Sequence, residues 1–399
     1  MSRPPLRVAV LGAGIVGRAV IDGLTQHPER LETADGREIC LIAVAVRDIA
    51  KTRASGIPTS LLTDAPAHLV ADPDINVIVE LMGGIEPART LIVAALGAGK
   101  AVVTANKAVV AHHGPELEAA ARRSGAALRF EASVGGGIPV LGPIAAELAG
   151  NDITQIRGIV NGTTNYILTA MAEEGRSYDD VLRDAQERGY AEADPSGDVE
   201  GDDAVNKLVI LSRLAFDEWL DPATVCRRPP TINGDGKPGI TGVTDGEIEA
   251  ATRLGLAIKL LATAGRGEAG IEAAVMPTAI PADSAFGRTS GVMNRIEIEA
   301  EPLGTVAFSG PGAGGAATSS AVLGDLVAVA RGAGSIWAGR PAAHGPVASH
   351  GPFDRPRAWF TRTTDGAPMS SDAMALHDVR AMLASKMRDA DAAIYPIDG

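Results

Sequence analysis

The glycine pattern near the start of the chain restricts the possible folds more than any other feature. An apolar run over residues 7–11 is followed by Gly12-x-Gly14-x-x-Gly17, and a helical pattern of apolar residues continues to residue 24. Glycines between a strand and a helix allow a tight turn and close approach of the backbone to a pyrophosphate, and the helix N-terminus offers unpaired N–H groups. The alternative is a glycine turn that serves only strand–helix packing. The motif predicts a dinucleotide-binding turn made by Gly12, Ala13, Gly14, Ile15, Val16 and Gly17.

Apolar runs alternate with helix-length segments through the first third of the chain. The continuous apolar run at residues 39–46 and the largely apolar run at 77–82 are typical of strands buried on both faces of a parallel sheet, and further strands are expected at 101–104 and 128–132. Segments of helical length separate them, including residues 90–99. We therefore expect an α/β protein in which residues 1–133 form a Rossmann-type, doubly wound parallel sheet.

A second domain of a different kind is expected over residues 134–309. Strands are predicted at residues 156–160, 271–276, 295–300 and 305–309, and helices at 166–174, 178–188 and 203–216. These elements indicate an α+β domain with a mixed or antiparallel sheet. Residues 310–340 contain a glycine cluster and an apolar helix at 318–331, and residues 341–399 form a tail.

Composition excludes several classes of protein. The 399 residues are 46% hydrophobic and 21% charged, which excludes a disordered chain. Lys and Arg number 36 against 49 Asp and Glu, and a net charge of −13 without a basic patch argues against nucleic-acid binding. No apolar stretch has the length of a membrane helix. The two cysteines, Cys40 and Cys226, fit the reducing cytoplasm, where we expect the protein to act.

The residues after the second expected strand bear on cofactor choice. A fold that selects NAD places a carboxylate here on the ribose 2′-hydroxyl, whereas an arginine suits a 2′-phosphate. Arg47 follows the strand and Lys51 lies just downstream, which favours NADP(H) over NAD(H). The alternatives are a solvated charged loop, or an NAD site that uses Asp48.

Two lysines are candidates for chemistry. Lys107 closes the segment Thr104-Ala105-Asn106-Lys107 after a strand, so it lies at the carboxyl edge of the sheet, where ligands bind. Lys207 stands four residues after Asp203, on one face of a predicted helix, and follows an acidic loop that contains Glu192. Such a loop can bind a cationic amino group while Lys207 exchanges a proton with an oxygen. The alternatives are a surface lysine and an exposed ion pair; the acidic spacing is not that of a calcium loop.

Several motifs in one order give the chain a specific resemblance. The glycine motif, TANK at 104–107, NGTTNYIL at 161–168, GYAEADP at 189–195 and Asp203-x-x-x-Lys207 together resemble homoserine dehydrogenase over roughly residues 7–330. That family reduces L-aspartate 4-semialdehyde to L-homoserine with NADPH or NADH, on the route to threonine, methionine and isoleucine. The alternatives are another amino-acid oxidoreductase on the same fold and a catalytically silent NADP(H) sensor.

The resemblance implies roles for the candidate residues. Glu192 and Asp203 match the carboxylates that hold the substrate's ammonium and hydroxyl groups, and Lys207 matches the proton donor. Lys107 matches a second active-site lysine near the nicotinamide, and Thr104 and Lys107 are expected to bind the cofactor. Backbone donors around Thr163 are expected to bind the substrate's α-carboxylate. Gly310 begins a glycine loop that returns to the cofactor, and the helix after it would pack on the first domain.

The resemblance also implies an ion and an assembly. A sodium or potassium ion is expected on the Glu131 carboxylate and the carbonyl oxygens of Val134, Gly136 and Ile138, because oxygen ligands suit hard cations. Family members form homodimers or higher homo-oligomers through the sheet of the second domain. Residues 356–362 resemble the first strand of a regulatory ACT domain that senses threonine, but the segment expected next is missing. We expect a truncated or degenerate regulatory domain, no threonine inhibition and a monofunctional enzyme.

Overall fold

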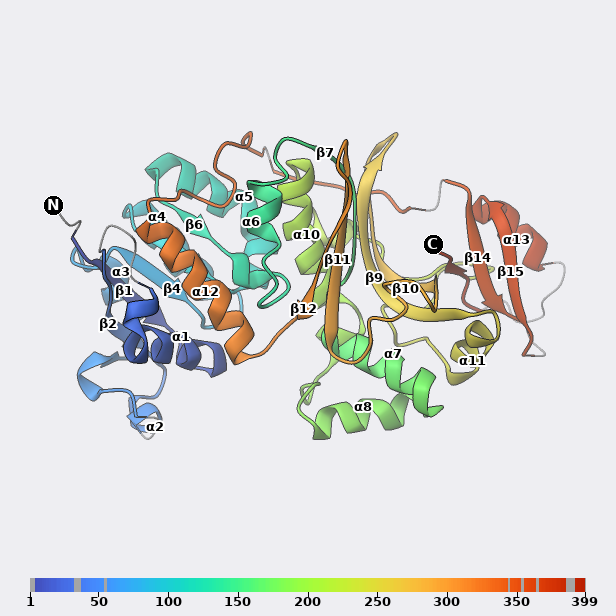
Figure 1. The fold of residues 1–399 in the computed structure, drawn as a ribbon, viewed down its shortest axis with the longest axis horizontal. Helices are drawn as coiled ribbons and strands as arrows, with labels where there is room; N and C mark the ends of the chain where they lie inside the picture. The colour runs from blue at the N-terminus through green and yellow to red at the C-terminus, as the bar shows by residue number, and fades with distance from the viewer. Residues whose placement is uncertain are drawn as a thin grey trace. The chain divides into compact units, whose positions relative to one another are not determined.

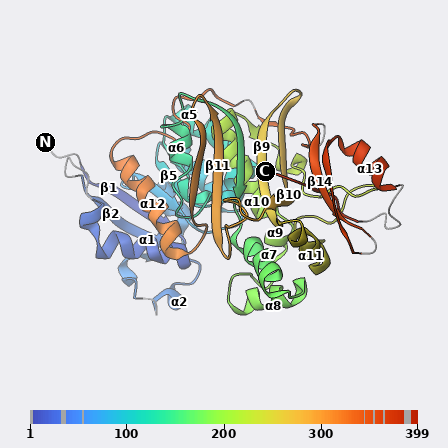
Figure 2. The same ribbon diagram turned by 45° about the vertical axis from the view of Figure 1, so that its right-hand side comes forward.

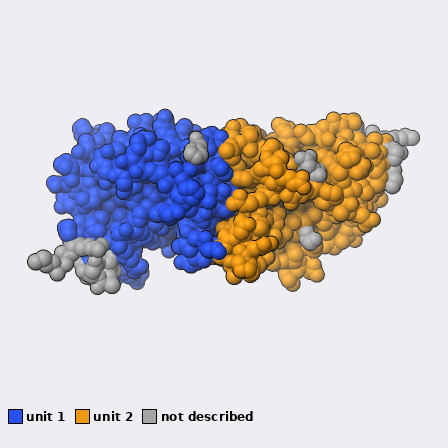
Figure 3. Space-filling model, turned by 90° about the horizontal axis from the view of Figure 1, so that it is seen from above, with its two compact units in different colours: residues 1–150, 210–219, 311–346 blue, residues 151–209, 220–310, 347–399 orange. Residues whose placement is uncertain are grey.

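The computed structural model describes residues 4–31, 37–53, 56–343, 345–352, 355–363, 366–384 and 392–398. The chain divides into two compact units, coloured separately in Figure 3. Unit 1 comprises residues 1–150, 210–219 and 311–346, and unit 2 comprises residues 151–209, 220–310 and 347–399. No helix within the described ranges is long and apolar enough to cross a membrane.

Unit 1 is built on the predicted parallel sheet. Its strands lie in the order β3-β2-β1-β4-β5-β6, and every pair is parallel. The bounds are β1 (Leu6–Leu11), β2 (Ile39–Ala45), β3 (Leu62–Thr63), β4 (Val77–Glu80), β5 (Ala101–Thr104) and β6 (Leu128–Arg129). The strand order reverses between β1 and β4, so the carboxyl ends of these strands form the switch point at which open α/β sheets bind ligands. The Rossmann-type prediction is confirmed.

Helices cover the sheet of unit 1. They are α1 (Ile15–Gln26), α2 (Ile49–Arg53), α3 (Pro66–Ala71), α4 (Ala88–Gly97), α5 (Lys107–Ser124), α6 (Leu141–Ala145) and α12 (Gly315–Ala330), with 3₁₀ turns at Pro28–Arg30, Thr59–Leu61 and Glu131–Ser133. Helix α12 comes from far along the sequence and lies beside α1 (Figure 1). Its Leu323 fills the space that a Cβ at Gly23 would occupy, and its Val322 and Leu326 join the core that includes Val20. The apolar helix expected at residues 318–331 therefore completes the core of the parallel sheet of unit 1.

Unit 2 contains a five-stranded sheet in the order β10-β9-β7-β11-β12. The bounds are β7 (Asp152–Ile159), β9 (Leu256–Gly267), β10 (Gly270–Pro281), β11 (Met293–Glu301) and β12 (Gly304–Pro311). The pairs of β9 with β10 and β7, and of β7 with β11, are antiparallel. Strand β9 was not among the predicted strands. It contains Lys259, which is only 4% exposed, and a charge inside an apolar run obscures the pattern of a buried strand.

Helices and a small sheet surround this strand array. The helices are α7 (Gly162–Glu174), α8 (Tyr178–Glu187), α9 (Ser196–Val199) and α11 (Asp245–Arg253), and α10 (Asp202–Phe216) contributes to both units. Helices α7, α8 and α11 lie together in both Figure 1 and Figure 2. The tail forms β14 (Arg357–Arg362), β15 (Pro368–Met374), α13 (Leu376–Ala384) and β16 (Tyr395–Pro396), with a small core that includes Trp359 and Leu383. The remaining short elements are β8 (Trp219–Leu220), a 3₁₀ turn at Pro222–Thr224 and β13 (Pro346–Val347).

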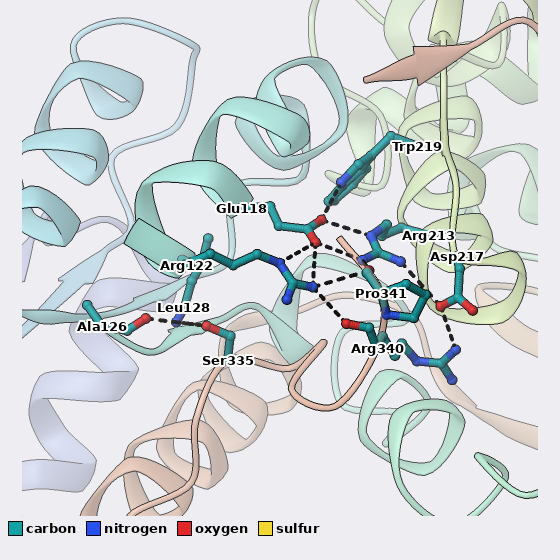
Figure 4. A network of polar contacts seen from close by, with 10 residues as sticks. All are labelled: Glu118, Arg122, Ala126, Leu128, Arg213, Asp217, Trp219, Ser335, Arg340 and Pro341. Carbon is teal, nitrogen blue, oxygen red and sulfur yellow. Dashed lines mark hydrogen bonds and ion pairs between the residues drawn. The ribbon is translucent and has the colours of Figure 1, made fainter. Parts of the chain in front are cut away.

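A buried ionic network joins segments of unit 1 that are far apart in sequence (Figure 4). The Glu118 carboxylate in α5 is 2% exposed, and it accepts hydrogen bonds from Arg213 Nη2 at 2.8 Å, Trp219 Nε1 at 2.8 Å and Arg122 Nε at 2.9 Å. Burial works to raise the pKa of Glu118, but the hydrogen bonds from Arg213, Trp219 and Arg122 outweigh it, and the pKa lies below its ordinary value. The Arg213 side chain is fully buried and also donates to the Pro341 carbonyl.

Replacing Arg213 with methionine should lower the free energy of unfolding by about 3–5 kcal/mol, because Glu118 would remain buried without its guanidinium partner. Arg253→Met is the matched control, since Arg253 and its partner Glu249 are 55% and 68% exposed and such pairs contribute at most ~1 kcal/mol. Urea unfolding followed by circular dichroism measures both. Equal losses in the two variants would contradict the assigned role of the network.

Candidate active site

The glycine turn of unit 1 has the geometry of a phosphate cradle. Gly12 has φ +107°, and a Cβ there would lie 2.6 Å from the Leu81 carbonyl oxygen. A Cβ at Gly17 would lie 2.1 Å from the Gly12 carbonyl oxygen, so packing requires both glycines. A Cβ at Gly14 would meet no atom within 4 Å. The open space at Gly14 therefore lies on the side from which a ligand can approach the backbone.

The N-terminus of α1 borders this open space. Gly14 is the N-cap, no side chain caps the helix, and no acidic residue lies in its first turn. The first amides are therefore available to an anion, and the helix dipole adds a partial positive charge. Ile15 is 82% exposed, whereas Ala13 and Val16 are half-buried. The residues of the turn thus fit the pyrophosphate of a dinucleotide.

A second glycine loop lies against the turn within unit 1. A Cβ at Gly315 would lie 3.0 Å from Ile15 Cγ2, so the start of α12 touches the start of α1. A Cβ at Gly136 would lie 2.7 Å from the Gly312 carbonyl, which brings the 134–138 segment to the same loop. Gly310 belongs to unit 2, where it lies in β12.

The residues expected to select the cofactor follow β2 at the carboxyl edge of the sheet. Arg47 and Asp48 are both exposed there, two and three residues after the strand ends. Lys51 falls in α2, but its side chain lies outside the described part of the chain. Arg47 is therefore accessible to a ligand that binds along this edge.

Lys107 is the first residue of α5 and is half-buried. The preceding turn is held by hydrogen bonds: Asn106 N–H donates to Thr104 Oγ1 at 2.9 Å, and Asn106 Oδ1 accepts from Val109 N at 3.2 Å. Thr104 in turn donates to the Glu80 carboxylate at 2.7 Å. The turn that presents Lys107 is thus anchored to β4, the neighbouring strand.

Asp203 and Lys207 form a buried ion pair in unit 2. The Lys207 Nζ lies 2.7 Å from Asp203 Oδ2 and donates to the Val160 carbonyl oxygen at 2.6 Å. Each side chain is 9% exposed, which excludes the alternative of a solvated surface pair. Charges are kept at such burial only when paired and hydrogen-bonded.

Asn161 and Asp198 complete this cluster, although sequence analysis gave neither a catalytic role. Asn161 Nδ2 donates to Asp203 Oδ2 at 2.8 Å and to Asp198 Oδ1 at 2.7 Å. Burial first, then the charge of Asp203, raise the pKa of Asp198. Asn161 also caps α7 by accepting from Thr164 N at 2.9 Å. A strand followed by Asn-Gly-Thr-Thr is the sequence signal for such a cap.

Thr163 and Glu192, the other two residues predicted to bind the substrate, make their hydrogen bonds to residues outside the ion pair. Thr163, in the first turn of α7, donates its hydroxyl to the Tyr190 carbonyl oxygen at 2.8 Å. The Glu192 side chain is exposed, and its backbone carbonyl accepts from Gln186 Nε2 at 3.1 Å. Asp203 and Lys207 are thus brought together in the structure, whereas Glu192 remains open to solvent.

Glu131 is 8% exposed and accepts three backbone hydrogen bonds. Its Oε1 accepts from Val140 N and Leu141 N, each at 2.8 Å, and its Oε2 accepts from Gly142 N at 2.7 Å. Burial and the charge of Asp325 raise the pKa of Glu131 against these hydrogen bonds.

The residues whose carbonyl oxygens are expected to join Glu131 at a cation, Val134, Gly136 and Ile138, are all buried. Among the described residues, no backbone N–H of a loop or turn donates to their carbonyl oxygens. No cluster of three His, Cys, Asp or Glu side chains suited to a metal occurs in the described part of the chain. The sodium or potassium ion therefore stays a prediction.

Two family models together match most of the chain between residues 12 and 327. The family model for homoserine dehydrogenase matches residues 139–327, and the model for the homoserine dehydrogenase NAD-binding domain matches residues 12–131. A homoserine dehydrogenase from Corynebacterium glutamicum is 44% identical over 330 residues, which are 81% of this chain and 72% of that protein. One from Bacillus subtilis is 40% identical over 324 residues, again 81% and 72%.

Solved structures of homoserine dehydrogenases are also similar to this chain. A homoserine dehydrogenase from Thiobacillus denitrificans has a TM-score of 0.87 at 33% identity and covers 100% of this chain and 99% of its own. A hyperthermophilic archaeal homoserine dehydrogenase in complex with NADPH has a TM-score of 0.68 at 29% identity, over 81% of this chain and 97% of its own. This chain belongs to the homoserine dehydrogenase family, pyridine-nucleotide oxidoreductases that act on a CH–OH group.

Proposed function

We propose that this protein interconverts L-homoserine and L-aspartate 4-semialdehyde with NADP(H), in the biosynthesis of threonine, methionine and isoleucine. The observation that carries the proposal is the buried Lys207–Asp203 pair, which is held by Asn161 and the Val160 carbonyl. A pair at this burial has no role in solvation and suits a proton donor whose orientation must be kept.

Lys207 is the proposed proton donor. A lysine ammonium has three N–H bonds, and two of them go to Val160 O and Asp203 in the described structure. The third can donate to the aldehyde oxygen as negative charge develops there. The bound nicotinamide supplies or accepts the hydride. Asp203 balances the ammonium and fixes its direction.

The remaining site residues are proposed to bind the ends of the substrate and the cofactor. Glu192, which is exposed in the acidic loop, is assigned to the substrate ammonium. The first turn of α7 at Thr163 is assigned to the α-carboxylate, because the cap by Asn161 engages only the Thr164 amide in the described structure and the helix N-terminus has further N–H groups and a favourable dipole. Lys107 and the glycine turn are assigned to the cofactor, and Arg47 to its 2′-phosphate. The homodimer and the cytoplasmic location remain predictions.

Two other functions make different predictions. A silent NADP(H) sensor would bind NADPH without oxidising any amino acid, and another oxidoreductase on this fold would reject homoserine. The buried Lys207 favours catalysis over sensing, because a sensor does not require a buried proton donor.

Replacing Lys207 with methionine should lower kcat for homoserine oxidation by about 10²–10⁴-fold, because in this direction the neutral Lys207 amine would accept the proton that the substrate hydroxyl gives up as the hydride leaves. NADPH affinity should change little. Lys237→Met, which removes an exposed lysine of the same unit, is the control and should keep wild-type rates. The nicotinamide absorbance change measures turnover. Wild-type kcat in Lys207→Met would remove this residue from the mechanism, and no turnover by the unaltered protein would favour the sensor.

Replacing Arg47 with serine should reduce the preference for NADP over NAD, expressed as the ratio of kcat/KM values, by about tenfold to a hundredfold. The reason is the loss of a hydrogen-bonded charge pair with the 2′-phosphate. Arg30→Ser removes a guanidinium that is 71% exposed in the same unit and should leave the ratio unchanged. An unchanged ratio in Arg47→Ser would assign cofactor choice to other residues.

A bound sodium or potassium ion should stabilise the fold by mass action, by about 2.7 kcal/mol at a hundred times its Kd. The melting temperature should therefore rise saturably when NaCl or KCl replaces choline chloride at constant ionic strength. Holding ionic strength constant removes general screening. The same melting temperature in all three salts would contradict the cation site at Glu131, Val134, Gly136 and Ile138.

A further inference from the structure

A buried carboxylate outside the proposed reaction lies at the cofactor edge of unit 1. Glu80 is the last residue of β4 and is 0% exposed. Its register partner on β5 is Thr104, which begins the turn to Lys107. Burial raises the pKa of Glu80, and hydrogen bonds led by that of Thr104 oppose this effect. Among the described residues, no cationic side chain forms an ion pair with it. Hydrogen bonds alone therefore hold this carboxylate.

Glu80 is the acceptor in each of these hydrogen bonds. Asn106 N–H donates to Thr104 Oγ1 at 2.9 Å, so the single hydroxyl hydrogen of Thr104 is free to donate to Glu80 Oε2 at 2.7 Å. On the other side, Glu80 Oε1 accepts from Met82 N at 2.8 Å. Both oxygens of Glu80 thus act as acceptors, and each accepts from a different loop at the carboxyl edge of the sheet.

The two loops are also joined to each other and to the glycine turn. Asn106 Nδ2 donates to the Gly84 carbonyl oxygen at 2.7 Å, which closes a ring of contacts through Glu80, Thr104 and Asn106. Leu81 follows Glu80 in the sequence, and a Cβ at Gly12 would lie only 2.6 Å from the Leu81 carbonyl oxygen, so the 81–84 loop packs closely against the glycine turn. A shift of the 81–84 loop would therefore disturb both the phosphate cradle and the turn that presents Lys107.

We propose that Glu80 is a positioning residue, whose buried carboxylate fixes the 81–84 loop and the Thr104–Lys107 turn in the single arrangement that binds the nicotinamide cofactor. This inference rests on the proposed function, which assigns the cofactor and Lys107 to this edge. Glu80 acts through Met82 and Thr104 and does not itself touch the reacting atoms. Its effect is to keep the binding-competent arrangement populated before the cofactor arrives.

A carboxylate meets this requirement better than an amide. Glutamine has the same shape, but its side chain offers one acceptor oxygen and one donor NH₂ group. In one orientation the NH₂ faces the Met82 N–H, which cannot accept, and the 81–84 loop loses its anchor. In the other the NH₂ faces Thr104 Oγ1, so the hydroxyl hydrogen must turn away and a hydrogen bond to a neutral amide replaces one to a charged group. Losing a hydrogen bond to a buried charged group corresponds to roughly a tenfold to hundredfold change in an equilibrium.

The test compares Glu80→Gln with Glu118→Gln, a second buried carboxylate of unit 1 that lies in the ionic network of α5. Both variants should melt at lower temperature than the wild type. Only Glu80→Gln should raise the Kd for NADPH and NADH, measured by fluorescence, by roughly tenfold or more. It should also lower kcat while the KM for homoserine is kept, because the proposed substrate carboxylates belong to unit 2. Cofactor Kd values equal to those of Glu118→Gln would overturn the proposal.

A second pair of variants keeps the test decisive if Glu80→Gln does not fold. Thr104→Val removes the hydroxyl that reaches Glu80, and Thr104→Ser retains it, so serine should recover most of the cofactor affinity lost with valine. Equal affinities in the two would also overturn the proposal. Because cofactor binding is measured without substrate, a protein that binds NADPH in a Glu80-dependent way but does not oxidise homoserine would refute the proposed function and leave this inference standing.

Discussion

The ion pair between Lys207 and Asp203 is the interaction on which the catalytic unit depends. Two side chains that are each 9% exposed keep their charges only when they are paired and hydrogen-bonded. Asn161 donates to Asp203 and the Val160 carbonyl accepts from Lys207, and both come from the junction between β7 and α7. The same asparagine caps α7. One side chain therefore caps this helix and holds the carboxylates of Asp203 and Asp198, which connects the folding of unit 2 to the geometry of its site.

The nucleotide-binding unit could be predicted from sequence because its signals are local. Strands buried on both faces produce continuous apolar runs, and β2, β4 and β5 each begin at the expected residue. Packing requires Gly12 and Gly17, as the motif predicts. The catalytic sheet was harder to predict. Strand β9 places a lysine inside an apolar run, and α7 begins at Gly162, four residues before the predicted start, because the Asn161 cap satisfies its first amides.

The site residues that escaped prediction depend on contacts between segments that are distant in sequence. Glu80 lies at the end of an apolar strand and has no motif of its own, and its role emerges only when β4 pairs with β5 and brings Thr104 alongside. Asp198 was one of several acidic residues in a loop, and only the fold turns it toward Asn161. Spacing along a helix identified Lys207 and Asp203, since residues four apart share a face. Hydrogen bonds across strands have no comparable periodicity.

A second buried lysine in unit 2 shows why Lys207, and not any buried ammonium, suits proton transfer. Lys259 Nζ donates to Asn165 Oδ1 at 3.1 Å, Thr169 Oγ1 at 3.3 Å and Thr289 O at 2.9 Å. All three of its N–H bonds are thus occupied by neutral oxygens, and burial lowers its pKa to about 8. Lys207 has a carboxylate to balance its charge, and its two partners in the described part of the chain leave one N–H for the substrate oxygen of the proposed reaction. Lys259 serves to tie α7 to the 284–293 segment, whereas Lys207 combines a held position with an available proton.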